Sequence, residues 1–181
     1  MRTVHFSLRS LQRNLLLAVQ GVIFGLTVFA MPAQAEGPDS DSALRQQVAA
    51  FLDEWHDDAA HARLRYFDKI APEGVYIGTD KSERWKRDDF KHWAKPFFDK
   101  GKAWNFHAIK RNIDFSPDKS FIWFDEQLDT QMGVCQASGV IRQTKEGLKI
   151  EHYQLSLTVP NDLVTQVQGE IKEYDDKHPG K

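Results

Sequence analysis

The hydrophobic pattern of this chain changes its period once, near Trp104, and this change limits the folds open to it. Before that point apolar residues recur at the spacing of amphipathic helices. After it they alternate with polar residues, which is typical of strands with one buried face. The sequence therefore predicts an α+β domain in which an antiparallel sheet bends around helices that come earlier in the chain.

Two amphipathic helices are expected before the change of period. The first begins after an N-cap at Ser42 and continues, with a second short helical piece, up to the stop at Pro72. The second spans residues 87–100, where Pro96 should kink the helix or end it early. A short strand at 75–78 lies between them. The first helix should pack through an apolar stripe made of Leu44, Val48, Phe51, Leu52, Trp55 and Ala59.

Long strands are expected after the change of period, over residues 104–115, 121–128, 132–143 and 148–159. The alternation changes phase between Ala108 and Ile109, which predicts a bulge or a strong bend inside the first of these strands. A final amphipathic helix follows from Leu163. A bent sheet that does not close forms a cone, and the mouth of a cone is a natural pocket.

Residues 1–35 have the pattern of a secretory signal peptide. Three arginines come first, an apolar stretch covers 15–29, and Ala-Gln-Ala at 33–35 offers the small residues that signal peptidase accepts. The stretch is short for a spanning helix, so an uncleaved anchor is the weaker alternative. We expect cleavage after Ala35 and a periplasmic or secreted protein without a membrane anchor. Its parts would be a leader at 36–41, a domain at 42–162, and a helix and tail at 163–181.

Composition excludes several classes of function. After the expected cleavage the chain carries 21 Lys and Arg against 26 Asp and Glu, a net charge of −5, which argues against a nucleic-acid partner. Cys135 is the only cysteine, so the chain cannot form an intrachain disulfide. The sequence contains no Cys-His-acid motif that would identify Cys135 as a catalytic nucleophile. His56 and His61 are five residues apart, which suits no shared metal ion on a helix, and we expect neither a metal nor a cofactor.

Three motifs resemble the nuclear-transport-factor-two-like superfamily in its SnoaL-like branch. They are the Gly-Thr-Asp-x-x-Glu-x-Trp segment at 78–85, Trp-Phe-Asp-Glu at 123–126, and the closing strand at 148–156, where Leu148 replaces the usual Trp. The resemblance covers about residues 44–160 and implies a nuclear-transport-factor-two-like, or cystatin-like, roll with a cone-shaped sheet. It does not imply one reaction, because the superfamily includes isomerases, dehydratases, hydrolases, transport factors and assembly domains.

Four residues are candidates for acid–base catalysis. Strict alternation along 148–159 would point His152 into the cone, where it could act as a base or simply be a core histidine with its hydrogen bonds satisfied. A carboxylate in an aromatic pocket can also move protons. Asp125 and Asp129 share one face of their strand and Glu126 takes the other. The alternative is that one carboxylate is solvated and another pairs with Arg111 or a lysine.

A second set of residues could bind a ligand. Glu83 beside Trp85 could hold a polar ligand edge and stack on its ring, or Glu83 could instead cap the helix that follows. Trp104, Trp123, Phe106 and Phe121 are expected mostly in the core. The complete set of ligand-binding candidates is Glu83, Arg84, Trp85, Arg111, His56 and Trp104.

Three functions remain open at this stage. The first is the binding of a small organic ligand in the cone. The second is cofactor-free acid–base catalysis by His152 with one carboxylate, and the third is an accessory or assembly role. Because residues 148–159 are apolar on both faces, a second subunit is expected to cover the convex face, which would carry Tyr153, Leu155 and Leu157.

Overall fold

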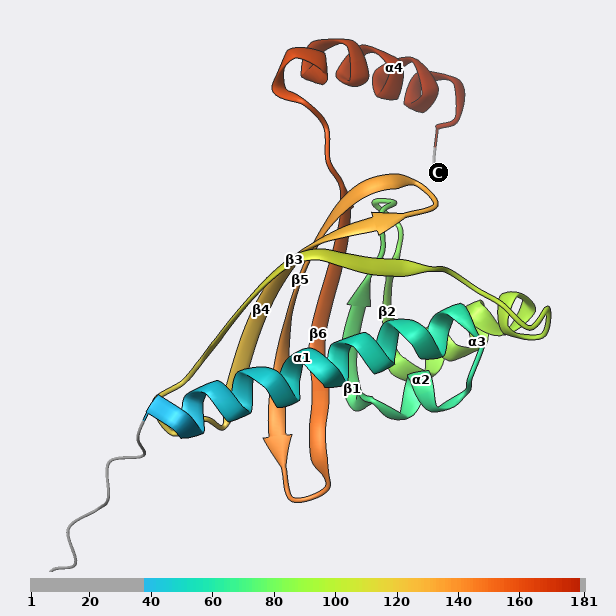
Figure 1. The fold of residues 1–181 in the computed structure, drawn as a ribbon. Helices are drawn as coiled ribbons and strands as arrows, with labels where there is room; N and C mark the ends of the chain where they lie inside the picture. Colours follow the sequence, from blue (N-terminus) through green and yellow to red (C-terminus); the bar gives the residue numbers. More distant parts are fainter. Residues whose placement is uncertain (1–37, 180–181) are drawn as a thin grey trace, which may run out of the picture. The chain divides into compact units, whose positions relative to one another are not determined.

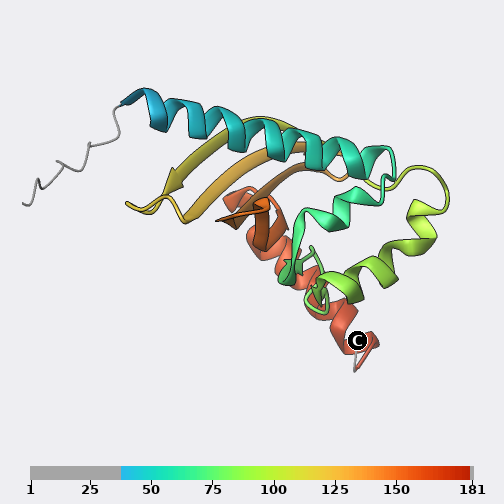
Figure 2. The same ribbon diagram turned by 90° about the horizontal axis from the view of Figure 1, so that it is seen from below.

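The structure is a computed structural model that describes residues 38–179 (Figures 1 and 2). The expected signal peptide and the start of the leader lie outside these residues. The elements in chain order are α1 (Pro38–Ala60), α2 (Arg65–Asp68), β1 (Ile70–Ile77), β2 (Arg84–Lys86), α3 (Arg87–Phe98), β3 (Phe106–Phe115), β4 (Phe121–Thr130), β5 (Gly133–Thr144), β6 (Gly147–Leu157), a 3₁₀ turn (Asn161–Leu163) and α4 (Val164–Lys177).

The six strands form one open sheet in the order β2-β1-β6-β5-β4-β3. Strands β3 to β6 pair antiparallel in sequence order, as predicted. The sheet is mixed, because β1 enters it beside β6 and the two strands run parallel. Helix α1 crosses one face of the strands, called here the inner face (Figure 2). The α+β class and the roll around N-terminal helices are confirmed.

The core lies between α1 and the inner face. Five of the six residues in the predicted stripe of α1 are buried, with Val48, Leu52 and Ala59 at 0% exposure, and the sixth, Phe51, is partly buried. Every second residue of β4 and β5 is buried on the sheet side of this core, among them Ile122 and Leu128. This pattern is the period-two burial expected of a sheet with one covered face.

A β-bulge in β6 reverses the expected orientation of half that strand. Val140 of β5 pairs with His152, but the next residue of β5, Ile141, pairs with Ile150, so β6 carries one extra residue between them. The strand therefore changes phase. Tyr153 is buried at 0% exposure on the inner face, and His152 points to the outer face. The expectation that His152 faces the cone is wrong for this reason.

The same bulge corrects the expected composition of the outer face. Tyr153 and Leu155 belong to the core, not to the convex surface. Phe121 and Trp123, which were expected in the core, are 46% and 48% exposed. Both occupy outward positions of β4, where alternation puts every second side chain on the uncovered face.

Other local expectations agree with the structure in most respects. The predicted bulge in β3 is present, with the register shift between Ala108 and Lys110. Helix α1 begins at Pro38, four residues before the expected N-cap, and proline is favoured at a helix start. Helix α3 ends at Phe98, two residues after Pro96. Strand β2 was not predicted.

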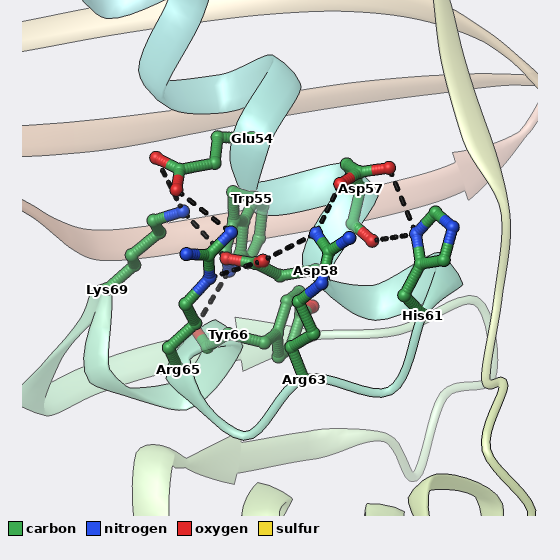
Figure 3. Close-up of polar contacts among 9 residues, drawn as sticks. All are labelled: Glu54, Trp55, Asp57, Asp58, His61, Arg63, Arg65, Tyr66 and Lys69. Atoms are coloured by element: carbon green, nitrogen blue, oxygen red, sulfur yellow. Dashed lines mark hydrogen bonds and ion pairs between the residues drawn. The ribbon is translucent and has the colours of Figure 1, made fainter.

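A buried carboxylate fixes the turn between α1 and α2 (Figure 3). The side chain of Asp58 has 0% exposure and lies 3.2 Å from Arg63, 2.7 Å from Arg65 and 2.7 Å from Lys69. Burial alone would raise the pKa of Asp58, but hydrogen bonds from these three cations hold it below its usual range. The carboxylate is therefore fully compensated and has a structural role.

Helix α4 lies apart from the sheet (Figure 1). Its apolar side chains, among them Ile171 and Tyr174, are exposed. An ion pair of 2.8 Å between Lys81 and Asp175 links this helix to the turn after β1. None of the helices within residues 38–179 is long and apolar enough to cross a lipid bilayer.

Candidate functional site

A pocket of about 250 Å³ opens beside β1, β2 and α3 and is mostly aromatic. Five separate parts of the chain meet there: the β1–β2 hairpin, α3, the segment that leads into β3 together with the start of that strand, the β4–β5 turn, and β6. We call it the aromatic pocket. Its lining residues are Tyr76, Gly78, Thr79, Glu83, Trp85, Phe90, Trp93, Phe97, Ala103, Trp104, Phe106, Gln131, Met132 and Leu155.

The rings of the aromatic pocket hold one another in place. Trp85 of β2 is paired with Tyr76 of β1, and the Trp85 ring packs on Phe90 and Trp93 of α3. The ring centroids of Trp85 and Trp93 are 4.6 Å apart, and those of Phe90 and Tyr76 are 4.0 Å apart and stacked. Phe90 also stacks on Trp104 at 5.6 Å. Rings that pack on one another in this way are held in fixed positions, so a ligand that contacts them costs little side-chain entropy on binding.

Deeper in the fold, the space between the helices and the sheet is filled by protein. Trp55 stacks on Tyr66 with centroids 4.9 Å apart and meets Tyr153 edge-on at 4.8 Å. Its indole nitrogen donates to the Tyr66 carbonyl at 3.1 Å. Burial raises the pKa of Tyr66, Tyr76 and Tyr153, so these phenols stay neutral.

Glu83 is the one carboxylate that lines the aromatic pocket. The turn before β2 holds it, because the Gly78 N–H donates to the Glu83 carbonyl at 2.9 Å and the Asp80 N–H donates to Oε2 at 3.2 Å. A Cβ on Gly78 would lie 2.1 Å from that oxygen, so glycine is needed for this side-chain position. The side chain is partly buried.

A second polar cluster lies outside the aromatic pocket, between α1, β3 and β4. Glu126, with 0% side-chain exposure, accepts a hydrogen bond of 2.8 Å from His56 and another of 2.8 Å from Arg111. Arg111 also bonds to Asp53 at 2.8 Å. Burial would raise the pKa of Glu126, but the hydrogen bonds from His56 and Arg111 hold it below its usual range. Glu126 is thus an ionised, paired carboxylate.

The structure brings three of the six ligand-binding candidates together in the aromatic pocket: Glu83, Trp85 and Trp104. Arg84 is exposed, because it alternates with Trp85 on β2. His56 and Arg111 belong to the cluster around Glu126. Phe90, Trp93 and Phe97 also line the pocket, although the sequence analysis did not name them as ligand-binding candidates. They lie on the helix predicted over residues 87–100, but the sequence does not show that the β1–β2 hairpin brings a pocket to their rings.

The four catalytic candidates do not meet in one place. Asp125 and Asp129 are exposed on the outer face of β4, and Asp125 accepts a hydrogen bond of 2.9 Å from Asn112. His152 lies on that same face, whereas Glu126 points inward. His152 and Glu126 therefore lie on opposite faces of the sheet and do not form the predicted catalytic pair. Among residues 38–179, no group of three or more His, Cys, Asp or Glu residues is arranged to hold a metal ion.

Comparison with protein families identifies a single domain type. The profile of the SnoaL-like domain matches residues 48–160. A search of curated proteins found no match.

Several solved structures share the fold. An NTF2-like protein of unknown function from Pseudomonas putida is 8% identical with a TM-score of 0.55, and the match covers 67% of this chain and 91% of that one. The association domain of CaMKII from C. elegans is 13% identical with a TM-score of 0.55, over 66% and 99% of the two chains. A proposed ketosteroid isomerase from Parabacteroides distasonis is 13% identical with a TM-score of 0.52, over 64% and 88%. At these identities the likeness concerns the fold alone.

The buried cluster leads to a stability prediction. Glu126→Gln should lower the free energy of unfolding by about 3 kcal/mol near neutral pH, because it leaves His56 buried beside a neutral amide and removes the buried one of the two carboxylates that pair with Arg111. The folded pKa of Glu126 lies below its unfolded value of about 4.3, so its stabilisation is present above that pH and is lost as the pH falls through the folded pKa. Urea denaturation across this acid range measures both effects.

The adjacent Asp125→Asn is the matched control, because Asp125 is exposed on the opposite face of the same strand. It should change the unfolding free energy little. Equal losses in both variants would contradict the structural role assigned to Glu126.

Proposed function

The chain belongs to the SnoaL-like domain family, and from this premise we propose that it binds a small organic molecule in its aromatic pocket. The observation that carries the proposal is a pocket of about 250 Å³ bordered by seven aromatic side chains. An apolar cavity of about 150 Å³ already holds benzene. The pocket therefore suits a molecule of one or two rings, or an aliphatic compound of similar size.

The arrangement of titratable groups favours binding over acid–base catalysis. His152 faces away from the pocket, and the His56–Glu126 pair is tied into a cluster with Arg111. Glu83 is the one acidic side chain in the lining of the pocket, and burial raises the pKa of Tyr76, which keeps that phenol neutral. General acid–base catalysis commonly uses two groups on one substrate. A single carboxylate among aromatic rings is better suited to orienting a ligand than to moving protons in both directions.

Filling the pocket tests the proposal. Ala103 lines it and is only partly buried, so Ala103→Phe should occupy the space of the ligand and leave the fold intact. We expect a set of small aromatic and aliphatic compounds to include some that raise the melting temperature of the wild type but not that of this variant. Such shifts arise because a ligand that binds only the folded state stabilises it.

If no compound stabilises the wild type, or if the stabilising compounds act equally on Ala103→Phe, the pocket is not the binding site. Chemical conversion of a stabilising compound would favour the enzyme alternative. In that case Glu83 would be the first residue to test for activity.

We also propose that the domain acts outside the cytoplasm, after cleavage behind Ala35. The support is the sequence pattern of residues 1–35. Expression of the full chain in a Gram-negative host should yield a periplasmic protein whose N-terminal residue is Glu36, read by intact mass and N-terminal sequencing. A full-length protein that stays in the cytoplasm or the inner membrane would contradict this proposal.

A homodimer through the outer face of the sheet is the third part of the proposal. Trp123, Val140 and His152 form one cross-strand row on that face, and Phe121 lies next to it. Trp123 and Phe121 are about half exposed in the single chain. Large aromatic side chains that are exposed on a sheet face are typical anchors of protein interfaces.

Trp123→Lys tests this interface. Sedimentation of the wild type should show a dimer, and the variant should sediment as a folded monomer because a charge replaces the anchor. Tyr174→Lys on α4 is the control, since Tyr174 is similarly exposed but lies on another element. A wild type that remains monomeric over a wide range of concentration would rule out the dimer.

A further inference from the structure

We propose that the ligand of the aromatic pocket is an organic cation, such as a quaternary or protonated amine, with Glu83 as its counter-ion. This inference rests on the proposed function, because it concerns the same pocket. It depends on three features of that pocket: the charges that line it, the faces of its rings, and the way Gly78 holds Glu83.

The charge of the pocket is entirely negative. Its lining residues include one carboxylate, Glu83, and no lysine, arginine or histidine. Within the described part of the chain, Glu83 forms no ion pair, and its carboxylate accepts one hydrogen bond, the 3.2 Å bond from the Asp80 N–H. Other partly buried carboxylates here do have cations, such as Glu151 with Arg142. The pocket therefore has an uncompensated negative charge that a bound cation would neutralise.

The rings supply the second attraction for a cation. The face of an indole or phenyl ring carries negative potential, and a cation within about 6 Å of the centroid is attracted to it. Trp85, Trp93 and Trp104 all border the pocket, and tryptophan gives the strongest interaction of this kind. Lys100, which is exposed and does not line the pocket, already lies 5.9 Å from the centroid of Phe97 at its border. A cage of aromatic rings with one carboxylate combines both attractions.

The backbone holds the carboxylate for this role. Oε2 of Glu83 rests against Gly78, where any Cβ would lie 2.1 Å away. The contact is with the flexible end of a side chain, so Gly78→Ala should displace the carboxylate at little cost in stability. This substitution moves the carboxylate of Glu83 without changing the net charge of the protein. It therefore separates the effect of the carboxylate's position on binding from the effect of net charge.

A pair of isosteric probes tests the inference. Phenyltrimethylammonium and tert-butylbenzene have the same shape and differ by one positive charge. Binding can be followed by tryptophan fluorescence, because three tryptophans border the pocket. We expect the cation to bind the wild type about tenfold more tightly than the neutral compound, as cation–π and partly screened ionic attraction together predict.

The variants then assign the attraction to Glu83. Glu83→Gln should weaken binding of the cation about fivefold and change binding of the neutral compound less than twofold, and Gly78→Ala should act in the same direction. Glu146→Gln is the matched control: it removes the same charge from an exposed turn and should leave both affinities unchanged. Melting curves of each variant verify that it is folded.

The possible outcomes separate the two proposals. If the neutral probe binds the wild type as tightly as the cation, or if Glu83→Gln weakens both equally, the inference is overturned and ligand binding in the pocket stands. If neither probe binds the wild type and none of the other small compounds stabilises it, the proposed function fails as well. If Glu146→Gln weakens binding of the cation as much as Glu83→Gln does, the attraction comes from the overall charge of the protein, and the assignment to Glu83 is overturned.

Discussion

The position of α1 on the sheet depends on the buried carboxylate of Glu126. This one side chain, on β4, accepts hydrogen bonds from His56 on α1 and from Arg111 on β3, each at 2.8 Å. A charge with no solvent exposure is tolerated only when such partners compensate its desolvation. Moving α1 along the sheet would break these hydrogen bonds, so the cluster fixes the position of the helix. Apolar contacts alone would allow several positions of similar energy.

The fixed helix decides which part of the interior remains open. Trp55 comes directly before His56 on α1, and its ring fills the centre of the fold between Tyr66 and Tyr153. The aromatic pocket lies farther along, where α3 and the β1–β2 hairpin bring their rings together around Glu83. The structural carboxylate and the carboxylate of the pocket are thus separate. One is neutralised by the protein, and the other has no cation partner within the described residues.

Local periodicity was sufficient to predict the class of the fold. Helical spacing before Trp104 and alternation after it correctly gave α1, α3 and the meander from β3 to β6. The bulge in β3 was visible because Ala108 and Ile109 break the alternation. The bulge in β6 was not visible, because residues 148–159 are apolar on both faces and fit either phase. Its position is set by pairing with β5, which a single strand does not encode, and that is why His152 was assigned to the wrong face.

The site was predictable in part for the same reason. The sequence identified Glu83 and Trp85 as ligand-binding candidates because they are only two residues apart. Their meeting with Trp93 and Trp104 depends on long-range packing, and so does the pairing of Glu126 with His56, 70 residues away. The parallel contact of β1 with β6 joins the two ends of the domain, and nothing in the local pattern of either strand indicates it.

Native mass spectrometry of the protein, purified gently from the cells that produce it, tests the central claim most directly. The account predicts a population that carries one small organic cation per chain, which wild-type protein retains and Ala103→Phe loses. A wild-type protein that is empty in every preparation and gains no mass when extracts of small molecules are added would contradict the account. So would an anionic compound retained equally by both proteins.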